Sequence, residues 1–361
     1  MAGTRMFSLL MGSALLCSVA QAQTPGDYAD YLRSYSEDPL DVSQDTSPIS
    51  DRISNDAVEY EGGSCGSCDD CSSGGSGSLC DSCCGSCEDP KLFGLFARSD
   101  REFSRFISPI SNPFFFEDPR ALTEARGHFV NQVIPSSSGL GKGDMQLYAV
   151  QLRAAVTDRL SIIATKDGYI TQQFDNLPND EGVADVAAGF KYAFLRDSRN
   201  QRIATAGMTF EADLGDKRVF QGTGDGEFHF FLSGGFEFLE RGHWLSGTGF
   251  RIPTDHTQRS QMWWWSNHWD YEFIDNLYGL IELNWFHWMR SGERLAVNFE
   301  GGDLLNLGST NVAGNDIVTM AVGGRARLTE GVTVGAGWEY PLTNRRDMLH
   351  DRAYADLIFR Y

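Results

Sequence analysis

The sequence predicts an all-β protein: an antiparallel up-and-down transmembrane β-barrel of about 12 strands, preceded by a disordered leader. Two observations lead to this fold class. From Leu122 onward, uncharged residues recur at every second position, which is the signal of a β-strand with one apolar face. In addition, short acidic turns alternate with longer loops along the same region.

The apolar rows are long. The stretches 184–194, 204–214, 228–238 and 318–328 each carry six uncharged residues at alternating positions. Rows of this length imply strands of about 11–12 residues, which exceeds the usual strand of soluble sheets and approaches the length that crosses a membrane. The positions between them are polar or charged, so we expect one face toward lipid and the other toward the lumen.

The connections alternate in length. Five short turns have acidic centres at Asp158, Asp197, Glu240, Asp275 and Glu330. Six longer loops cover 136–143, 172–181, 216–225, 254–259, 291–315 and 343–348. Short turns at one end and long loops at the other are typical of an outer-membrane barrel. A secreted β-sandwich would also alternate, but it requires neither an even strand number nor one-sided loops.

The N-terminal part divides into segments by composition. Residues 1–22 read as a cleaved signal peptide, with Arg5, an apolar run and a small-residue cleavage site at Ala20–Ala22. Residues 23–61 form an acidic leader and 62–90 a Cys/Gly/Ser-rich linker. Residues 23–90 carry 15 acidic and 2 basic residues, a net charge of −13 out of −19 for the chain. This segment has too few apolar residues to offset its ordering entropy, and the acidity argues against nucleic-acid binding.

The linker contains seven cysteines in CxxC-like spacing. Such spacing suits zinc or an iron–sulfur cluster, but there is no histidine or apolar shell to hold the geometry. In an exported chain we favour disulfides, with the odd cysteine available to a partner in the cell envelope. No cofactor is otherwise predicted. The disulfide or metal candidates are Cys65, Cys68, Cys71, Cys80, Cys83, Cys84 and Cys87.

A Phe/Pro-rich pre-barrel segment follows at 91–121. Pro109, Pro113 and Pro119 exclude a long helix. We expect irregular chain packed on the body, and a plug or an interfacial anchor is the alternative.

The charged positions of the strands define the candidate lumen. Twelve strands lie between filled barrels of eight and open channels of 16–18, so a narrow or plugged pore is expected, with passive transport of small solutes as the most favoured function. An envelope anchor whose cysteine-rich leader binds a partner is the alternative. A lipid hydrolase using Ser246 and His287 is more remote, because no GxSxG or HExxH motif is present. No catalytic residue is assigned. The lumen-lining candidates are Arg153, Lys191, Glu211, Asp213, Glu227, Glu237, Arg251, Glu282, Arg325, Arg327 and Glu339.

The final strand alternates up to Phe359 and Tyr361. It resembles the C-terminal strand of Gram-negative outer-membrane proteins, which the barrel-assembly machinery recognises by a terminal aromatic residue. The barrel (122–361) is therefore expected in the outer membrane, in contact with lipid. Trp263, Trp264, Trp265, Trp269, Trp285, Trp288 and Trp338 fit interfacial girdles.

Three stretches extend the resemblance: KLFGLF after the cysteines, ISPISNPFFFEDPR, and LRAAVTDRLSIIATKDGYI. Together they look like a group of uncharacterised planctomycete outer-membrane proteins. This resemblance implies a class and a location, and no substrate.

Overall fold

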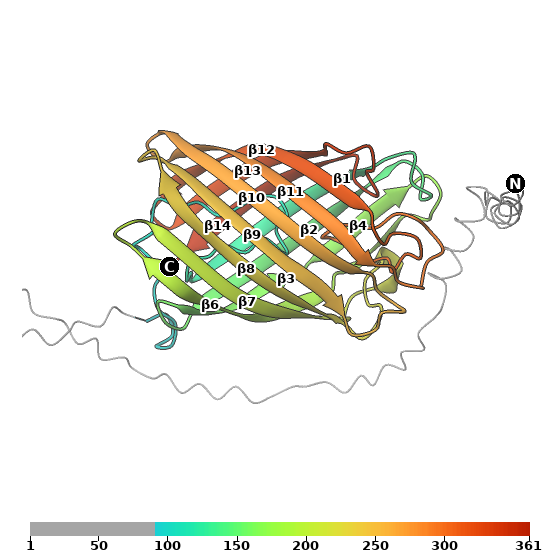
Figure 1. The fold of residues 1–361 in the computed structure, drawn as a ribbon, viewed down its shortest axis with the longest axis horizontal. Coiled ribbons are helices and arrows are strands. Elements are labelled where there is room, and N and C mark those ends of the chain that lie inside the picture. Colours follow the sequence, from blue (N-terminus) through green and yellow to red (C-terminus); the bar gives the residue numbers. More distant parts are fainter. Residues whose placement is uncertain (1–90) are drawn as a thin grey trace, which may run out of the picture. The chain divides into compact units, whose positions relative to one another are not determined.

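The computed structural model describes residues 91–361, which form a closed antiparallel β-barrel (Figure 1). The sheet closes because β1 pairs with β2 on one side and with β14 on the other. The signal peptide, the acidic leader and the cysteine linker lie outside the described residues. The strands are β1 (Glu124–Ile134), β2 (Gly143–Ala155), β3 (Leu160–Lys166), β4 (Tyr169–Phe174), β5 (Asp180–Val183), β6 (Val186–Asp197), β7 (Arg202–Ala212), β8 (Glu227–Phe238), β9 (Gly242–Pro253), β10 (Gln261–Ile274), β11 (Leu277–Arg290), β12 (Asp316–Thr329), β13 (Val332–Pro341) and β14 (Asp351–Arg360).

The wall contains 12 strand positions, which confirms the predicted number. Two positions are each built from two segments. β3 and β4 both pair with β2, and their other neighbours are β6 and β5 respectively. The connections also follow the prediction: turns of two to four residues join the strands at one end, and longer loops join them at the other. We call these the short-turn end and the long-loop end.

The interruption between β3 and β4 is stabilised by a side chain. Asp167 Oδ1 accepts a hydrogen bond from the backbone N–H of Val150 at 2.8 Å, which satisfies a donor that would otherwise lack a ladder partner. Gly168 follows with a φ of +118°, and a Cβ there would lie 2.4 Å from the carbonyl oxygen of Tyr148. Only glycine fits this bend without displacing the neighbouring strand.

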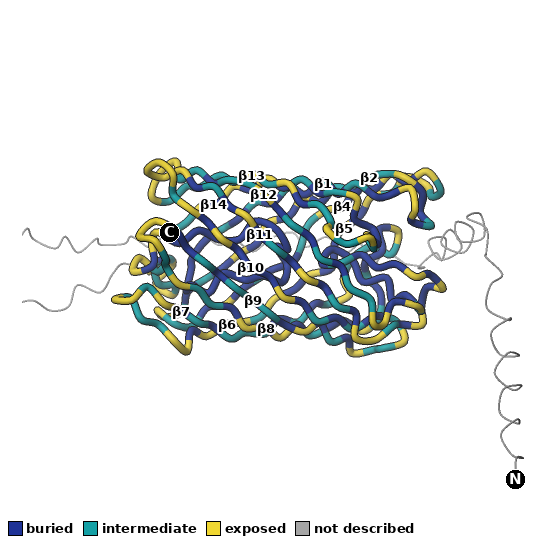
Figure 2. The backbone as a smooth tube through the Cα atoms, turned by 45° about the horizontal axis from the view of Figure 1, so that its top comes forward, coloured by how far each residue is buried: buried dark blue, intermediate teal, exposed yellow. Residues whose placement is uncertain are grey.

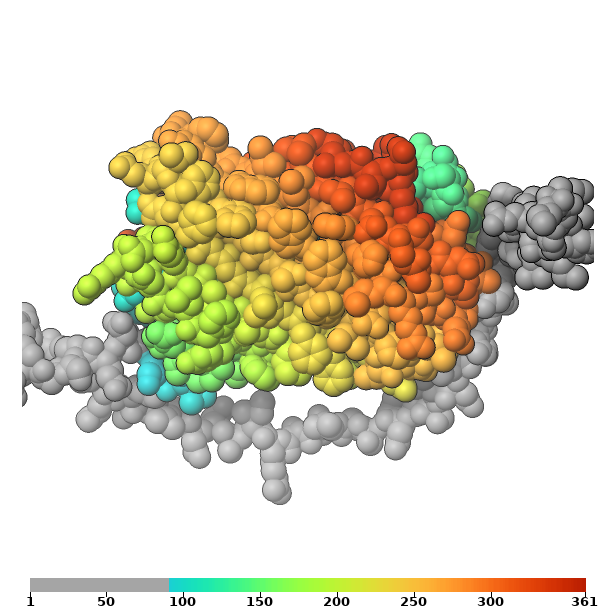
Figure 3. Space-filling view, viewed as in Figure 1, coloured from blue at the N-terminus to red at the C-terminus, as the bar shows by residue number. Residues whose placement is uncertain are grey.

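Exposed and buried residues alternate along the strands (Figure 2). In β2, Val150 is 50% exposed and Leu152 52%, whereas Gln151 between them is fully buried. The apolar rows therefore face outward and the polar rows inward. In the space-filling view the outer wall is continuous across neighbouring strands on the face drawn (Figure 3).

The tryptophans divide between the two faces. Trp265, Trp269, Trp285 and Trp338 lie on the outer face, and they are between 36% and 51% exposed. Trp263 packs edge-on against Trp285 near the long-loop end, with ring centroids 5.1 Å apart. Two members of the predicted girdle are wrongly placed, because Trp264 and Trp288 point inward and are fully buried. Their positions in the alternation, one residue out of phase with their neighbours, account for this.

Candidate functional site

The lumen is occupied by the chain itself. Residues 97–123, which we call the plug segment, enter at the short-turn end, where the backbone N–H of Ala97 donates to the carbonyl of Ala155 and that of Ser99 to the carbonyl of Tyr361. From residue 106 to residue 124 every residue is buried. Figure 1 shows this cyan segment inside the ring of strands. From the sequence we favoured irregular chain packed on the body over a plug. This preference was wrong, because the segment lies inside the barrel.

The prolines of the plug segment hold it against the wall through their carbonyl groups. Pro109 accepts from Arg126 Nη2 at 2.7 Å and from Arg325 Nη2 at 3.1 Å. Similarly, the carbonyl of Pro113 accepts from a side chain of β2, and that of Pro119 from a side chain of β7. Because proline lacks an N–H and resists helix formation, this segment exposes backbone oxygens that the lumen must satisfy.

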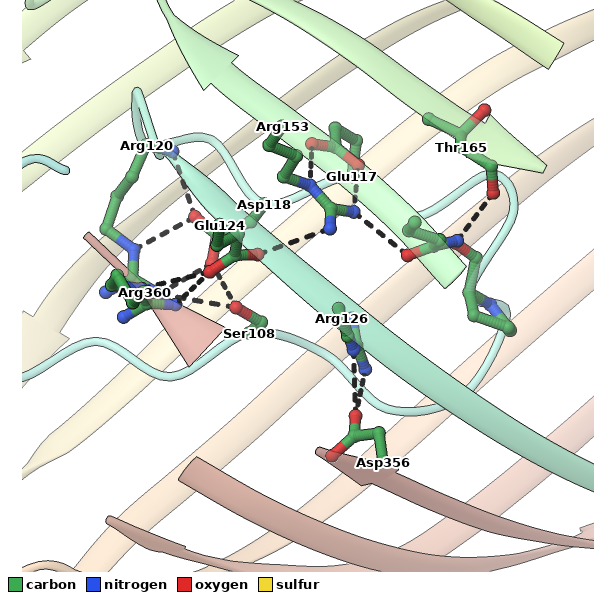
Figure 4. A network of polar contacts seen from close by, with 12 residues as sticks. Ser108, Glu117, Asp118, Arg120, Glu124, Arg126, Arg153, Thr165, Asp356 and Arg360 are labelled. Carbon is green, nitrogen blue, oxygen red and sulfur yellow. Dashed lines mark hydrogen bonds and ion pairs between the residues drawn. The ribbon is translucent and has the colours of Figure 1, made fainter. Parts of the chain in front are cut away.

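A buried carboxylate anchors the middle of the plug segment. Glu117 receives two hydrogen bonds from Arg153, each 2.6 Å long (Figure 4). A third comes from Lys191 Nζ at 2.8 Å. Next to it, Asp118 pairs with Arg120 at 2.7 Å inside the plug segment. All of these side chains are almost completely buried. The ion pairs of Glu117 therefore join plug to wall in a water-poor environment, where removing one partner is costly.

In a second anchor the wall, and not the plug, supplies the carboxylate. Glu282 on β11 accepts from the backbone N–H groups of Ile110 at 2.8 Å and Ser111 at 2.7 Å, and also from the Ser111 hydroxyl. His268 on β10 lies 2.6 Å from the same carboxylate and 3.0 Å from Asp270. One wall carboxylate thus satisfies two consecutive backbone donors of the plug.

Two of the three consecutive phenylalanines of the plug, Phe115 and Phe116, pack against an aromatic part of the wall. The Phe115 ring lies 4.8 Å from the His229 ring and 6.2 Å from that of Trp264. Phe116 fits where the wall has a glycine: a Cβ on Gly247 would lie only 2.7 Å from its ring. The wall therefore makes room for Phe116 by having a glycine at position 247.

The long-loop end is closed by loop 291–315. This loop buries Leu304, Leu305 and Leu307 and sends Asp303 to Arg352 at 2.7 Å. Asn306 donates to Glu227 at 2.8 Å. The sequence indicated a long loop here but gave no sign that it turns inward, because its leucines have no regular spacing.

The predicted lining residues have different surroundings. Arg153, Lys191, Glu282 and Arg325 contact the plug segment as described above. Near the short-turn end, Glu237 pairs with Arg105 at 2.7 Å and Arg327 donates to the Ser104 carbonyl at 2.6 Å. The other inward members bind wall or loop groups: Glu211 with Lys166 and Arg259, Glu227 with Asn306, Arg251 with the Gly302 carbonyl, and Glu339 with Asn284, Thr319 and Tyr354.

One candidate was wrongly placed. Asp213 follows the last residue of β7, so the alternation ends before it, and its side chain is exposed in the loop. The candidates also omitted Lys166 and Gln151, which complete the interior contacts. Within the plug, the run Glu117-Asp118-Pro119-Arg120 beside three phenylalanines was the available signal, since charges in an apolar segment need partners when buried.

The hydrolase residues are not brought together. The Ser246 hydroxyl donates to the carbonyl of Ser266 and accepts from Trp265 Nε1, while His287 pairs with Asp316 on the outer face. Ser246 on β9 is opposite Asn267 of β10, and His287 on β11 is opposite Trp263 of β10. The two residues are therefore separated by the width of β10 and by four residues along it. Within residues 91–361, no cluster of three or more His, Cys, Asp or Glu is arranged to hold a metal ion. No helix in the same range is long and apolar enough to cross a membrane.

A small cavity lies at the long-loop end, between loop 291–315 and loop 343–348. Its volume is about 20 Å³, which is room for one water molecule, and its lining includes Glu300, Asp303 and Asp347. Burial raises the pKa of Asp347 to about 7; the negative charge of Glu300 adds to this effect and Arg345 opposes it. The Asp347 carboxyl is thus a group at this end whose protonation changes near neutral pH.

We expect the closure of the long-loop end to weaken as pH rises. Because the folded pKa of Asp347 lies above its ordinary value of 3.8, the stabilisation is complete below about pH 4 and is lost as pH rises through about 7. The amide of Met348, which donates to Glu300, should lose roughly tenfold in exchange protection between pH 5 and pH 8.5. Hydrogen exchange by mass spectrometry measures this. Asp347→Asn should keep the low-pH protection at both values, and an equal pH dependence in both proteins would contradict the assignment.

Comparison with known proteins gives limited information. No family model matches the chain, and no curated protein matches it. Among solved structures, the NanC porin is 10% identical with a TM-score of 0.42, covering 66% of this chain and 99% of the porin. The KdgM porin is 9% identical with a TM-score of 0.39, over 66% and 99%. The transport unit of the autotransporter AIDA-I from Escherichia coli is 12% identical with a TM-score of 0.42, over 70% and 94%. These values assign the chain to no family, so the functional argument rests on the barrel itself.

Proposed function

We propose that this protein is an outer-membrane barrel that acts as a gated, narrow channel for small solutes, closed at rest by its own plug segment and by loop 291–315. The observation that carries the proposal is the polar character of the contact between plug and wall. Glu117, Glu282 and the carbonyl of Pro109 are held by ion pairs and hydrogen bonds that water can replace once the segment moves. The vacated lumen would be lined by both signs of charge, as a wet passage requires.

The membrane location is supported by the outer face. Strand residues such as Phe190, Phe194 and Ile281 are half exposed or more, at 50%, 56% and 50%. A water-soluble monomer rarely exposes a continuous apolar belt of this kind. Along the strands the charged outward residues, such as Asp316 and Asp351, lie at the ends, where a bilayer tolerates them. Export through a cleaved signal peptide, assembly through Phe359 and Tyr361, and the planctomycete resemblance remain predictions.

A reversible tether between plug and wall tests the channel. Asn284 Nδ2 lies 2.9 Å from the Ser111 hydroxyl, so cysteines at both positions should cross-link the plug to β11. In a background where the leader cysteines are serine, the double variant should show single-channel openings in planar bilayers under reducing conditions. Oxidation should abolish them. The two single-cysteine variants are the matched controls and should be insensitive to oxidant, and openings that persist in the oxidised double variant would contradict gating by the plug.

A second candidate is an anchor that never opens. It is favoured by the complete burial of residues 106–124, which leaves the resting lumen filled. In this case the barrel fixes the cysteine-rich leader to the membrane, and a disulfide-linked envelope partner would bind the leader. Absence of conductance in the wild type and in plug-weakened variants, together with cross-linked species on non-reducing gels, would favour the anchor over the channel.

A further inference from the structure

One buried arginine in the lumen has unused hydrogen-bond donors. Arg251 on β9 is 1% exposed, and its Nη1 donates to the carbonyl of Gly302 in loop 291–315 at 2.8 Å. Its Nε and Nη2 have no hydrogen-bond partner. The Glu227 carboxylate is 3.8 Å from Nε, beyond hydrogen-bond distance, and is shared with Arg259 and Asn306. A buried cation with two unpaired donors is energetically unfavourable unless a ligand completes it.

The same barrel shows what this edge of a guanidinium binds. The Nε and Nη2 atoms of Arg153 bind the two oxygens of one carboxylate. In Arg126 and Arg360 the same two atoms both donate to one oxygen of a carboxylate. The acceptors are Glu117, Asp356 and Glu124 respectively. This planar pair of N–H groups matches the two oxygens of a carboxylate. In Arg251 the corresponding N–H groups have no hydrogen-bond partner.

The surroundings of Arg251 favour a ligand with a ring and one negative charge. The Phe115 ring lies 5.7 Å from the guanidinium carbon, in a cation–π contact, and the rings of His229 and Trp264 lie beside it, so the surroundings of the guanidinium are aromatic. The three cations of this cluster face three carboxylates, so no net positive charge attracts an anion. A single carboxylate can use the two unpaired N–H groups of Arg251, but a second would find the donors of Lys166 and Arg259 already bound. The cluster consists of Lys166, Arg251, Arg259, Asp185, Glu211 and Glu227.

Arg251 also lies at the junction of the two closures. Loop 291–315 covers it through Gly302, and the plug supplies Phe115 beneath it. A solute entering from the long-loop end would meet Arg251 after displacing the loop and before displacing the plug. This position is suited to recognising the solute before the channel opens.

We propose that Arg251 is the carboxylate-binding residue of a lumen subsite for small ring-bearing monocarboxylates, with the ring packed on Phe115 and Trp264. The inference deepens the proposed function and rests on it, because the ligand reaches the site only when loop 291–315 opens.

Ligand binding to the full chain tests the subsite. Saturation-transfer NMR on the refolded protein in detergent should detect benzoate binding, about tenfold tighter than binding of neutral benzamide or of acetate, which lacks the ring. Arg251→Gln should abolish the benzoate signal. Arg251→Lys keeps the charge but loses the planar edge, and should weaken binding about fivefold or more. Arg327→Gln, which removes a lumen arginine near the short-turn end, is the matched control and should bind benzoate normally.

The outcomes separate the subsite from the channel. Equal binding of benzoate and benzamide, benzoate binding retained in Arg251→Gln, or no benzoate binding to the folded wild type would each overturn the subsite. Heat-modifiable migration on gels confirms that each variant is folded, and if Arg251→Gln is not, the comparison with Arg251→Lys decides. Benzoate binding in a barrel that never conducts would refute the channel and leave the subsite standing. Conductance without benzoate binding would refute the subsite and leave the channel standing.

Discussion

Replacing Glu117 by alanine should convert the closed barrel into a conducting one. The substitution leaves Lys191 buried without an ion-pair partner, and it leaves Arg153 with only the Glu124 carboxylate, at 3.2 Å. Breaking a buried ion pair by removing one partner costs about 3–5 kcal/mol, and this loss falls on the seated position of the plug. The wall is unchanged, and entering water can solvate the two cations only when the plug moves away. The open probability in planar bilayers should therefore rise by about 100-fold or more.

The control for this prediction is a carboxylate at the start of the plug. Glu102→Ala removes an acid that is half exposed, and its partner Arg196 keeps Asp100. Its open probability should stay near that of the wild type, because exposed ion pairs contribute little. Glu117→Gln, which retains the shape of the side chain, serves if the alanine variant does not refold. An unchanged open probability in both Glu117 variants would refute the role of this residue as an anchor.

Replacing Asp356 by alanine should destabilise the barrel as a whole. Asp356 on β14 accepts hydrogen bonds from Arg126 on β1 and Arg325 on β12, so one carboxylate joins three strands near the closure of the sheet. Without it two arginines are buried with only the Pro109 carbonyl between them. We expect the free energy of unfolding to fall by about 3–5 kcal/mol, measured by urea titration of the heat-modifiable gel band.

Asp213→Ala provides a matched control for this measurement. It deletes the same side chain at an exposed loop position, and the free energy of unfolding should change by less than about 0.5 kcal/mol. A loss of under about 1 kcal/mol for Asp356→Ala would show that the two arginines are solvated in the folded barrel, and so that the lumen is wetter than the buried contacts imply.

The rules of local sequence accounted for the wall. Alternation predicted which face of β2 carries Val150 and Leu152, and the spacing of turns predicted 12 strands with short turns at one end. Both properties are local, because the side-chain period of a strand is two residues and a tight turn is defined by its own few residues. Alternation gave the wrong face for Asp213, because β7 ends before it. It also gave the wrong face for Trp264, an aromatic residue at an inward-facing position.

The contents of the barrel were decided only in three dimensions. The order of the amino acids was enough to show that residues 91–121 are aromatic, rich in proline and not helical, and that the wall carries charges of both signs inside. It did not determine that Glu117 meets Arg153, or that Ile110 meets Glu282, because these partners are 36 and 172 residues apart. Such contacts depend on closure of the sheet, which brings strands distant in sequence around one lumen. The plug, the inward loop and the unpaired edge of Arg251 are all consequences of that closure.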